Sequence, residues 1–250
     1  KNLINKQIII KGRQLIAGVT EYPLWGAQAV YAFPTAAAGL EILSASANDA
    51  SAGTGIRTIQ IDYLDSNYAE KSTIVTLNGT SVVATSALDI FRVNRIRTLT
   101  AGTGLKAAGL ISLRNLADTP FYAYILAGYN ESEQCIYTVP AGKELYIEEV
   151  TGSLGSSAAG KSTTFFIKSN YDRESDSFTG YGATGILLSH YSFLTMDSSV
   201  NIPFKRPLRF PAKSDIIVTC IGTASGVATF DMRGLLLDAG EDYNNYARYE

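Results

Sequence analysis

The stretch TIVTLNGTSVV, residues 73–83, shows most directly how this chain folds. Apolar and β-branched residues form a run on each side of Asn78-Gly79, and such residues favour strands. Asn-Gly between two such runs is the strongest short-range signal for a β-hairpin, because both central residues of its tight turn take positive φ. The stretch therefore predicts two antiparallel strands joined by a turn at Asn78-Gly79.

Apolar and polar residues alternate with a period of two in segments before and after this hairpin, and such alternation indicates a strand with one buried face. In RTIQIDY, residues 57–63, the side chains of Ile59, Ile61 and Tyr63 share one face. Turn-forming residues separate such segments, and no window has the long 3.6-residue period of an amphipathic helix. The chain is therefore predicted to be all-β, with further strands at residues 90–98, 109–113, 144–150, 163–168, 186–196, 215–221 and 227–237.

A domain boundary is predicted where NLADTP, residues 115–120, interrupts the strands. Each half of the chain then ends in a similar way, with a strand, a turn of small residues and a final apolar strand. We therefore expect two tandem antiparallel β-sandwiches of jelly-roll type. Residues 1–118 would form an N-terminal arm and the first sandwich. Residues 119–250 would form the second sandwich and a short polar C-terminal tail.

Composition limits the classes of partner. The 250 residues include 21 Lys and Arg against 23 Asp and Glu, so the net charge is −2. Such a chain has no long-range field to attract nucleic acid or an anionic membrane. The longest apolar run, residues 121–129, is far shorter than the ~20 residues of a membrane helix. We expect neither nucleic acid nor a membrane as a partner, and Cys135 and Cys220 are too few for a disulfide framework.

The string GSSAAGKS, residues 155–162, matches the phosphate-binding pattern G-x-x-x-x-G-K-[ST] in full. That mechanism needs a helix after the loop, because the helix N-terminus helps to hold the phosphate. The following residues, TTFFIK at 163–168, are β-branched and aromatic and favour a strand. A loop that joins two strands is therefore favoured over a nucleotide site.

Candidate catalytic groups are few. His190 is the only histidine, so any Ser-His-Asp triad or His-metal site must use it, and its alternating neighbours favour a structural role. Hydrolysis by paired carboxylates requires two acids that converge on one cleft. Glu148 and Glu149 are adjacent in a predicted strand and should point to opposite faces. The sequence therefore predicts no catalytic residue, no cofactor and no enzyme.

Two groups of polar residues could be ion-binding sites, one for calcium and one for phosphate. DYLDSN, residues 62–67, could supply oxygen ligands to calcium, but it lacks the glycine and the distal Glu of the helix-loop-helix calcium loop, so a plain turn is favoured. Arg92, Arg95 and Arg97 form a small basic cluster, which more often pairs with neighbouring acids or a partner subunit than with phosphate. We expect no metal site.

The C-terminal tail carries the candidate interface. Residues 239–250 are too polar to form a core, yet Tyr243, Tyr246 and Tyr249 recur every three residues, with Arg248 among them. Tyr and Arg are enriched in interface cores. We expect these four residues, together with the N-terminal arm, to become ordered against a neighbouring subunit. A disordered tail is the alternative.

Seven phrases remain to be interpreted: YAFPTAA at 31–37, SANDASAGTGIRT at 46–58, YLDSNY at 63–68, VTLNGT at 75–80, FRVNR at 91–95, YTVPAGK at 137–143 and PLRFPAKSDI at 207–216. Together they resemble a family of structural proteins of tailed bacteriophages, over residues 20–237. The resemblance implies a jelly-roll fold and transfers no catalytic residue.

The resemblance also implies a role and a location. The chain would be a non-enzymatic component of the virion, either a capsid decoration protein or a neck- or tail-associated part. Its partners would be other virion proteins and copies of itself. The alternative is a carbohydrate-binding host-receptor module, which a jelly roll with 15 tyrosines permits.

Overall fold

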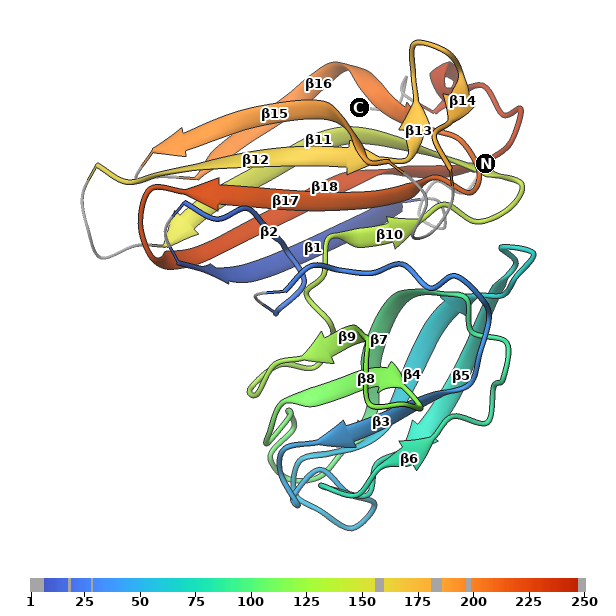
Figure 1. The fold of residues 1–250 in the computed structure, drawn as a ribbon, viewed down its shortest axis with the longest axis vertical. Helices are drawn as coiled ribbons and strands as arrows, with labels where there is room; N and C mark the ends of the chain where they lie inside the picture. Colours follow the sequence, from blue (N-terminus) through green and yellow to red (C-terminus); the bar gives the residue numbers. More distant parts are fainter. Residues whose placement is uncertain are drawn as a thin grey trace. The chain divides into compact units, whose positions relative to one another are not determined.

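The computed structural model describes residues 7–17, 19–27, 29–155, 160–180, 186–196 and 199–246. These residues form 18 strands and one short 3-10 helix, Tyr243–Asn245 (Figure 1). The all-β prediction is confirmed. Within the same ranges, no helix is long and apolar enough to cross a membrane.

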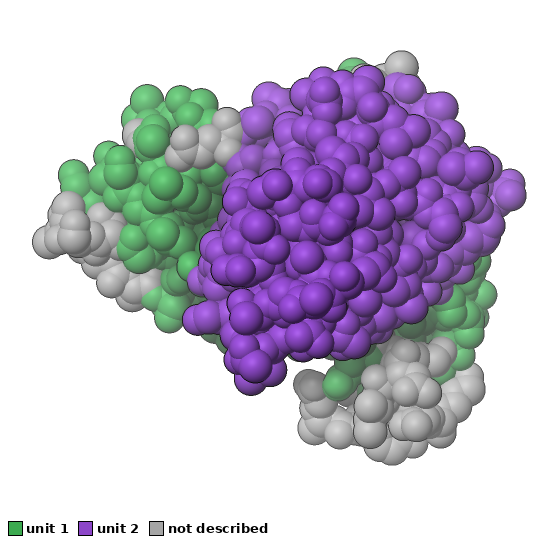
Figure 2. Space-filling view, turned by 90° about the horizontal axis from the view of Figure 1, so that it is seen from below, with its two compact units in different colours: residues 1–24, 135–250 green, residues 25–134 purple. Residues whose placement is uncertain are grey.

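The chain divides into two compact units, which Figure 2 colours separately. Unit 2 is Trp25–Gln134, and unit 1 combines Lys1–Leu24 with Cys135–Glu250. Unit 2 is thus inserted into unit 1, and this division differs from the predicted one between residues 118 and 119. The physical reason is that residues 115–120 form a turn inside unit 2. There β8 (Ile111–Asn115) pairs with β9 (Phe121–Ile125).

Unit 1 is a sandwich of two antiparallel sheets. One has the order β1-β18-β11-β16, formed by Gln7–Ile16, Gly226–Asp238, Lys143–Gly155 and Val200–Phe210. The other has the order β10-β17-β12-β15, formed by Ile136–Thr138, Asp215–Gly222, Ser162–Ser169 and Leu188–Met196. Three further strands of two residues each are β2 (Tyr22–Pro23), which pairs with β17, and the paired β13 (Tyr171–Asp172) and β14 (Ser177–Phe178).

The order of the eight longer strands defines the fold of unit 1. Numbered along the chain, they form sheets 1-8-3-6 and 2-7-4-5, which is the arrangement of an eight-stranded jelly roll. β1 belongs to this fold, because all ten of its residues pair with β18, from Gln7↔Leu235 to Ile16↔Gly226. Residues 7–10 of the N-terminal arm, which was expected to span residues 1–10, therefore belong to an edge strand of the jelly roll. Residues 1–6 lie outside the described residues.

Apolar and aromatic side chains fill the space between the sheets of unit 1. Along β12, Thr163, Phe165 and Ile167 face inward, while the residues between them are partly exposed. The ring of Phe165 lies 5.4 Å from that of Phe193 and 5.3 Å from that of Phe230. Burying a side chain of this size contributes about 2–3 kcal/mol.

Unit 2 is a second antiparallel sandwich. One sheet has the order β6-β3-β8-β9 and the other β5-β4-β7, where β6 is Val83–Ala84, β3 Leu40–Ser44, β5 Glu70–Thr76, β4 Ile56–Leu64 and β7 Arg92–Ala101. Ile59, Ile61 and Tyr63 are all buried, so the face predicted for residues 57–63 is confirmed.

A turn is present one residue later than predicted, and the hairpin predicted around it is wrong. Ser81 N donates to Asn78 O (3.1 Å), so Gly79 and Thr80 are the central residues, and Gly79 takes positive φ (61°). The strands on either side then separate, because β5 pairs with β4 and β6 pairs with β3 of the other sheet. Contacts with residues 44–49 position the turn: Ser44 N donates to Gly79 O (2.9 Å), and Gly79 N donates to Asp49 O (2.8 Å).

Candidate functional site

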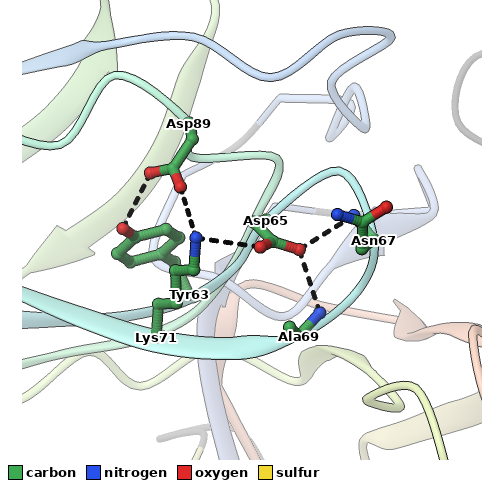
Figure 3. Close-up of polar contacts among 6 residues, drawn as sticks. All are labelled: Tyr63, Asp65, Asn67, Ala69, Lys71 and Asp89. Carbon is green, nitrogen blue, oxygen red and sulfur yellow. Dashed lines mark hydrogen bonds and ion pairs between the residues drawn. The ribbon is translucent and has the colours of Figure 1, made fainter.

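The most connected polar cluster of unit 2 is centred on Lys71 of β5 (Figure 3). Its ammonium lies 2.9 Å from Asp65 Oδ2, just after β4, and 2.7 Å from Asp89 Oδ2, just before β7. Tyr63 of β4 donates its hydroxyl hydrogen to Asp89 Oδ1 (2.9 Å). The cluster thus ties three neighbouring segments of one sheet together.

The second carboxylate oxygen of Asp65 shapes the adjoining turn. It accepts hydrogen bonds from the backbone N of Asn67 (2.8 Å) and of Ala69 (3.1 Å), and Tyr68 between them takes positive φ (62°). Both oxygens of Asp65 are therefore in use, with an ammonium group at one of them. Asp62 belongs to a different contact, since its Oδ2 lies 3.7 Å from Arg97 Nε. Residues 62–64 belong to β4, and residues 65–68 form a plain turn in which Tyr68 N donates to Asp65 O (2.8 Å), as the sequence favoured.

The charges of this cluster reinforce one another. Hydrogen bonds from Lys71 lower the pKa of both Asp65 and Asp89, and the same bonds raise the pKa of Lys71 above its ordinary value. Burial, and then the bond to Asp89, raises the pKa of Tyr63 to about 12. An amine can attack a carboxyl group only when it is neutral. The cluster consequently acts as a charged brace of the sheet, and its side chains are not poised for covalent chemistry.

A fully buried carboxylate, Asp49, organises the loop end of unit 2. Its Oδ1 accepts from the backbone N of Ile56 (2.8 Å) and Ala108 (3.0 Å). Its Oδ2 accepts from Ser44 Oγ (2.6 Å) and Gly109 N (2.9 Å). No short motif marks this role, because the four donors come from three separate segments that only the fold brings together.

The three arginines of the basic cluster have separate partners. Arg95 forms an ion pair with Glu131, and Arg97 donates to Gln60 (2.9 Å) beside Asp62. The interpretation that such arginines pair with neighbouring acids is confirmed for Arg95 and Arg97. Arg92 differs, because it is 1% exposed, donates to Pro34 O (2.8 Å) and lies 4.0 Å from the ring centre of Phe91. It is a buried cation held by carbonyl oxygens and aromatic faces.

The phosphate-binding string lies between two strands, as predicted. β11 ends at Gly155 and β12 begins at Ser162, where Ser162 N donates to Thr223 Oγ1 (3.0 Å). Residues 156–159 lie outside the described residues. Since a strand follows the string, it lacks the helix N-terminus that a phosphate site of this kind requires.

His190 is positioned by a bulge in β15. Ile167 pairs with Tyr191 and Lys168 with Ser189, so His190 is the extra residue between them. Its Nε2 lies 2.7 Å from Ser169 Oγ, a pair that the sequence could not reveal. Ser169 is completely buried, and its Oγ accepts from Tyr171 N (3.1 Å). Burial, and then the charge of Arg173, lowers the pKa of His190. This Ser-His pair is part of the packing of unit 1, because no substrate can reach a serine that is completely buried.

The prediction for Glu148 and Glu149 is wrong. A bulge interrupts β11 between Ile147 and Glu149, so Ile147 and Val150 are both buried while the two glutamates between them are partly exposed. Glu148 accepts from Tyr243 OH (2.8 Å), and Glu149 accepts from Asn201 Nδ2 (2.9 Å). Each carboxylate is therefore engaged by a separate surface contact.

The C-terminal tail packs on its own jelly roll. The ring of Tyr243 stacks on Tyr146 of β11 at 5.0 Å, and Tyr246 is 5% exposed in a small cluster with Leu235 and Leu237 of β18. Arg248 and Tyr249 lie outside the described residues. A contact of the tail with a neighbouring subunit stays a prediction. In the described ranges, no three His, Cys, Asp or Glu side chains are grouped as a metal site would need.

Comparisons with known proteins give low similarities. No family model and no curated protein matches the chain. A chain from a structure of infectious bursal disease virus, Gt strain, is 11% identical, covers 94% of this chain and 73% of that chain, and has a TM-score of 0.25. A chain from an empty virus-like particle of cowpea mosaic virus is 8% identical, covers 89% of this chain and 98% of that chain, and has a TM-score of 0.25. The PBSX exported protein XepA is 13% identical, covers 94% of this chain and 88% of that chain, and has a TM-score of 0.21. The jelly-roll assignment rests on the strand order of this chain itself.

Proposed function

We propose that this chain is a non-enzymatic structural protein of a bacteriophage virion. It works by binding copies of itself and other virion proteins, as a capsid decoration protein or as a neck- or tail-associated component. The observation that carries the proposal is the strand order of unit 1, because eight-stranded jelly rolls are building blocks of viral capsids. The bacteriophage assignment rests on the seven phrases that resemble tailed-phage structural proteins.

The way unit 2 is inserted supports a modular binding protein. Leu24 and Cys135, the residues of unit 1 that flank the insertion, are adjacent, because Cys135 N donates to Leu24 O (2.7 Å). Both also bond to Val218 of β17. The jelly roll therefore continues across the insertion point, and unit 2 can serve as a second binding module without interrupting it.

Fractionation of particles tests this function. Particles from a culture that produces the chain are purified, and the protein is followed by mass spectrometry and immunogold labelling. We expect a constant number of copies per particle and labelling at one type of position. Absence from purified particles would contradict the proposal. Reproducible binding on a glycan array by the purified chain would instead favour the carbohydrate-binding alternative.

We further propose that the tail contributes to assembly, with Tyr243 and Tyr246 holding it on the jelly roll and with Arg248 and Tyr249 as the contact residues. Removing the whole tail would uncover Leu235 and Leu237, so a smaller change is preferable. The double substitution Arg248→Ala and Tyr249→Ala keeps the docked Tyr243 and Tyr246. We expect normal thermal unfolding and reduced incorporation into particles. The matched control is Asn244→Ala, which changes an exposed tail residue and should incorporate normally. Unaltered incorporation of the double variant would contradict the role of the tail.

A further inference from the structure

The edge strands of the jelly roll differ in how they are protected. The two sheets of unit 1 end in β1 and β16 and in β10 and β15 (Figure 1). An edge strand presents unpaired N–H and C=O groups, and proteins block such edges with short strands, charged side chains or proline. β10 has three residues, β1 carries Lys11 and Arg13, and β16 carries Lys205, Arg206 and two prolines. Three of the four edges are thus protected.

β15 is the exception. Its nine residues, LSHYSFLTM, include no proline and no Asp, Glu, Lys or Arg. Among the described residues it pairs only with β12. The bulge at His190 interrupts regular pairing in its first half, and the second half continues without a bulge. The second half of β15 therefore presents a regular, uncharged edge.

The side chains beside this edge are apolar. Leu194 is 51% exposed, and Tyr191 and Phe193 are partly buried. The ring of Tyr191 lies 4.9 Å from Phe204 of β16, which also is partly buried. A partner strand at this edge would cover apolar side chains while it satisfied backbone groups.

We propose that β15 pairs in an antiparallel manner with β15 of a second copy of this chain, across a two-fold axis centred on Phe193. This inference rests on the proposed self-assembly and names the surface that carries it. Antiparallel pairing about Phe193 puts Phe193 opposite its own copy, Tyr191 opposite Thr195, and Ser192 opposite Leu194. These pairs lie in the part of β15 beyond the bulge.

Charge selects a second copy as the occupant. An identical β15 brings no ionised side chain into the contact, so pairing desolvates no charge and opposes no like charges. The same operation on β1 or β16 would bring Lys and Arg of the two copies together. A two-fold contact also closes, so it covers both open edges at once.

Charge substitution at Leu194 tests this pairing in solution. In the proposed register the two Leu194 side chains are diagonal neighbours at about 7–8 Å. We expect the full chain to dimerise in sedimentation equilibrium. Leu194→Lys and Leu194→Glu should each weaken the dimer at least about tenfold. An equimolar mixture of the two variants should restore dimers. Thr76→Lys, the same added charge at an exposed strand position of unit 2, should leave the dimer unchanged.

Several results would overturn the proposal. One is a wild-type chain that stays monomeric at all attainable concentrations. Another is that both Leu194 variants still dimerise as strongly as the wild-type chain. A third is that mixing the two variants fails to restore dimers. Amide exchange provides a second readout, because those amides of residues 192–194 that point away from β12 should become more protected as protein concentration rises. If pairing fails while the chain is still found in particles, only the proposed contact is lost, and the proposed function stands.

Discussion

Unit 1 and unit 2 are both antiparallel sandwiches with apolar cores, but they differ in one further set of contacts. In unit 1 the rings of Phe165, Phe193 and Phe230 meet between the sheets at 5.3–5.8 Å. In unit 2 the buried Asp49 and Arg92 connect segments that are distant in the sequence. We therefore expect loss of one of these rings to destabilise unit 1, and loss of Asp49 to destabilise unit 2.

The largest expected effect is that of Phe165→Ala. It removes a completely buried ring and leaves a cavity between the sheets, which should lower the free energy of unfolding of unit 1 by about 3–5 kcal/mol. Hydrogen exchange in denaturant measures the two units separately. The matched control is Phe166→Ala on the outward face of β12, with a loss below about 1 kcal/mol. Equal losses of unfolding free energy in the two variants would contradict the role assigned to the buried ring of Phe165.

Asp49→Ala is the corresponding test of unit 2. The substitution leaves four donors without their acceptor, and we expect a loss of about 2–4 kcal/mol in unit 2 alone. Asp49→Asn should cost nearly as much, because its amide nitrogen cannot accept. Asp89→Ala, which removes an exposed carboxylate, is the control and should lower the free energy of unfolding by less than Asp49→Ala does. Unaltered amide protection around Ile56 and Gly109 in Asp49→Ala would refute the role assigned to this carboxylate.

Removal of unit 2 tests whether unit 1 folds without it. Replacing residues 25–134 with a short Gly-Ser linker should leave unit 1 folded, because Leu24 and Cys135 are already held side by side. Loop-closure entropy changes slowly with length, so the stability of unit 1 should change by no more than about 1–2 kcal/mol. Circular dichroism and amide NMR spectra check the outcome. An unfolded unit 1 would show that the two units depend on one another.

The smallest expected effect is a pH dependence confined to unit 1. The lowered pKa of folded His190 means that the unfolded chain takes up a proton more readily. Stability contributed by the neutral ring is therefore full above the unfolded pKa of about 6.5 and is lost as pH falls below it, with a slope of at most about 1.4 kcal/mol per pH unit. His190→Gln should remove this slope from unfolding measured between pH 7 and pH 5. A slope that persists in the variant would contradict the assignment of the pH dependence to His190.

The fold was predictable where the information is local. Alternation identified β12 and β18 and the buried face of residues 57–63, because one-sided burial leaves a period of two. It failed for β16, whose prolines and cations are typical of an edge strand and conceal the alternation.

Long-range pairing explains the other differences. Asn78-Gly79 predicted a turn but not that the flanking strands join different sheets. The roles of Asp49 and of the Ser169-His190 pair depend on contacts across many residues, and no short motif marks them. The insertion of unit 2 is equally hidden, because only the pairing of β1 with β18 shows that both ends of the chain form one sheet.

Electron cryo-microscopy of the intact particle tests the proposed role of the chain in the virion. We expect repeated density into which the jelly roll of unit 1 fits with β1 beside β18, and from which the chain leaves and re-enters at Leu24 and Cys135 to form unit 2. A particle map in which every protein is accounted for without this chain would contradict the proposed role in the virion.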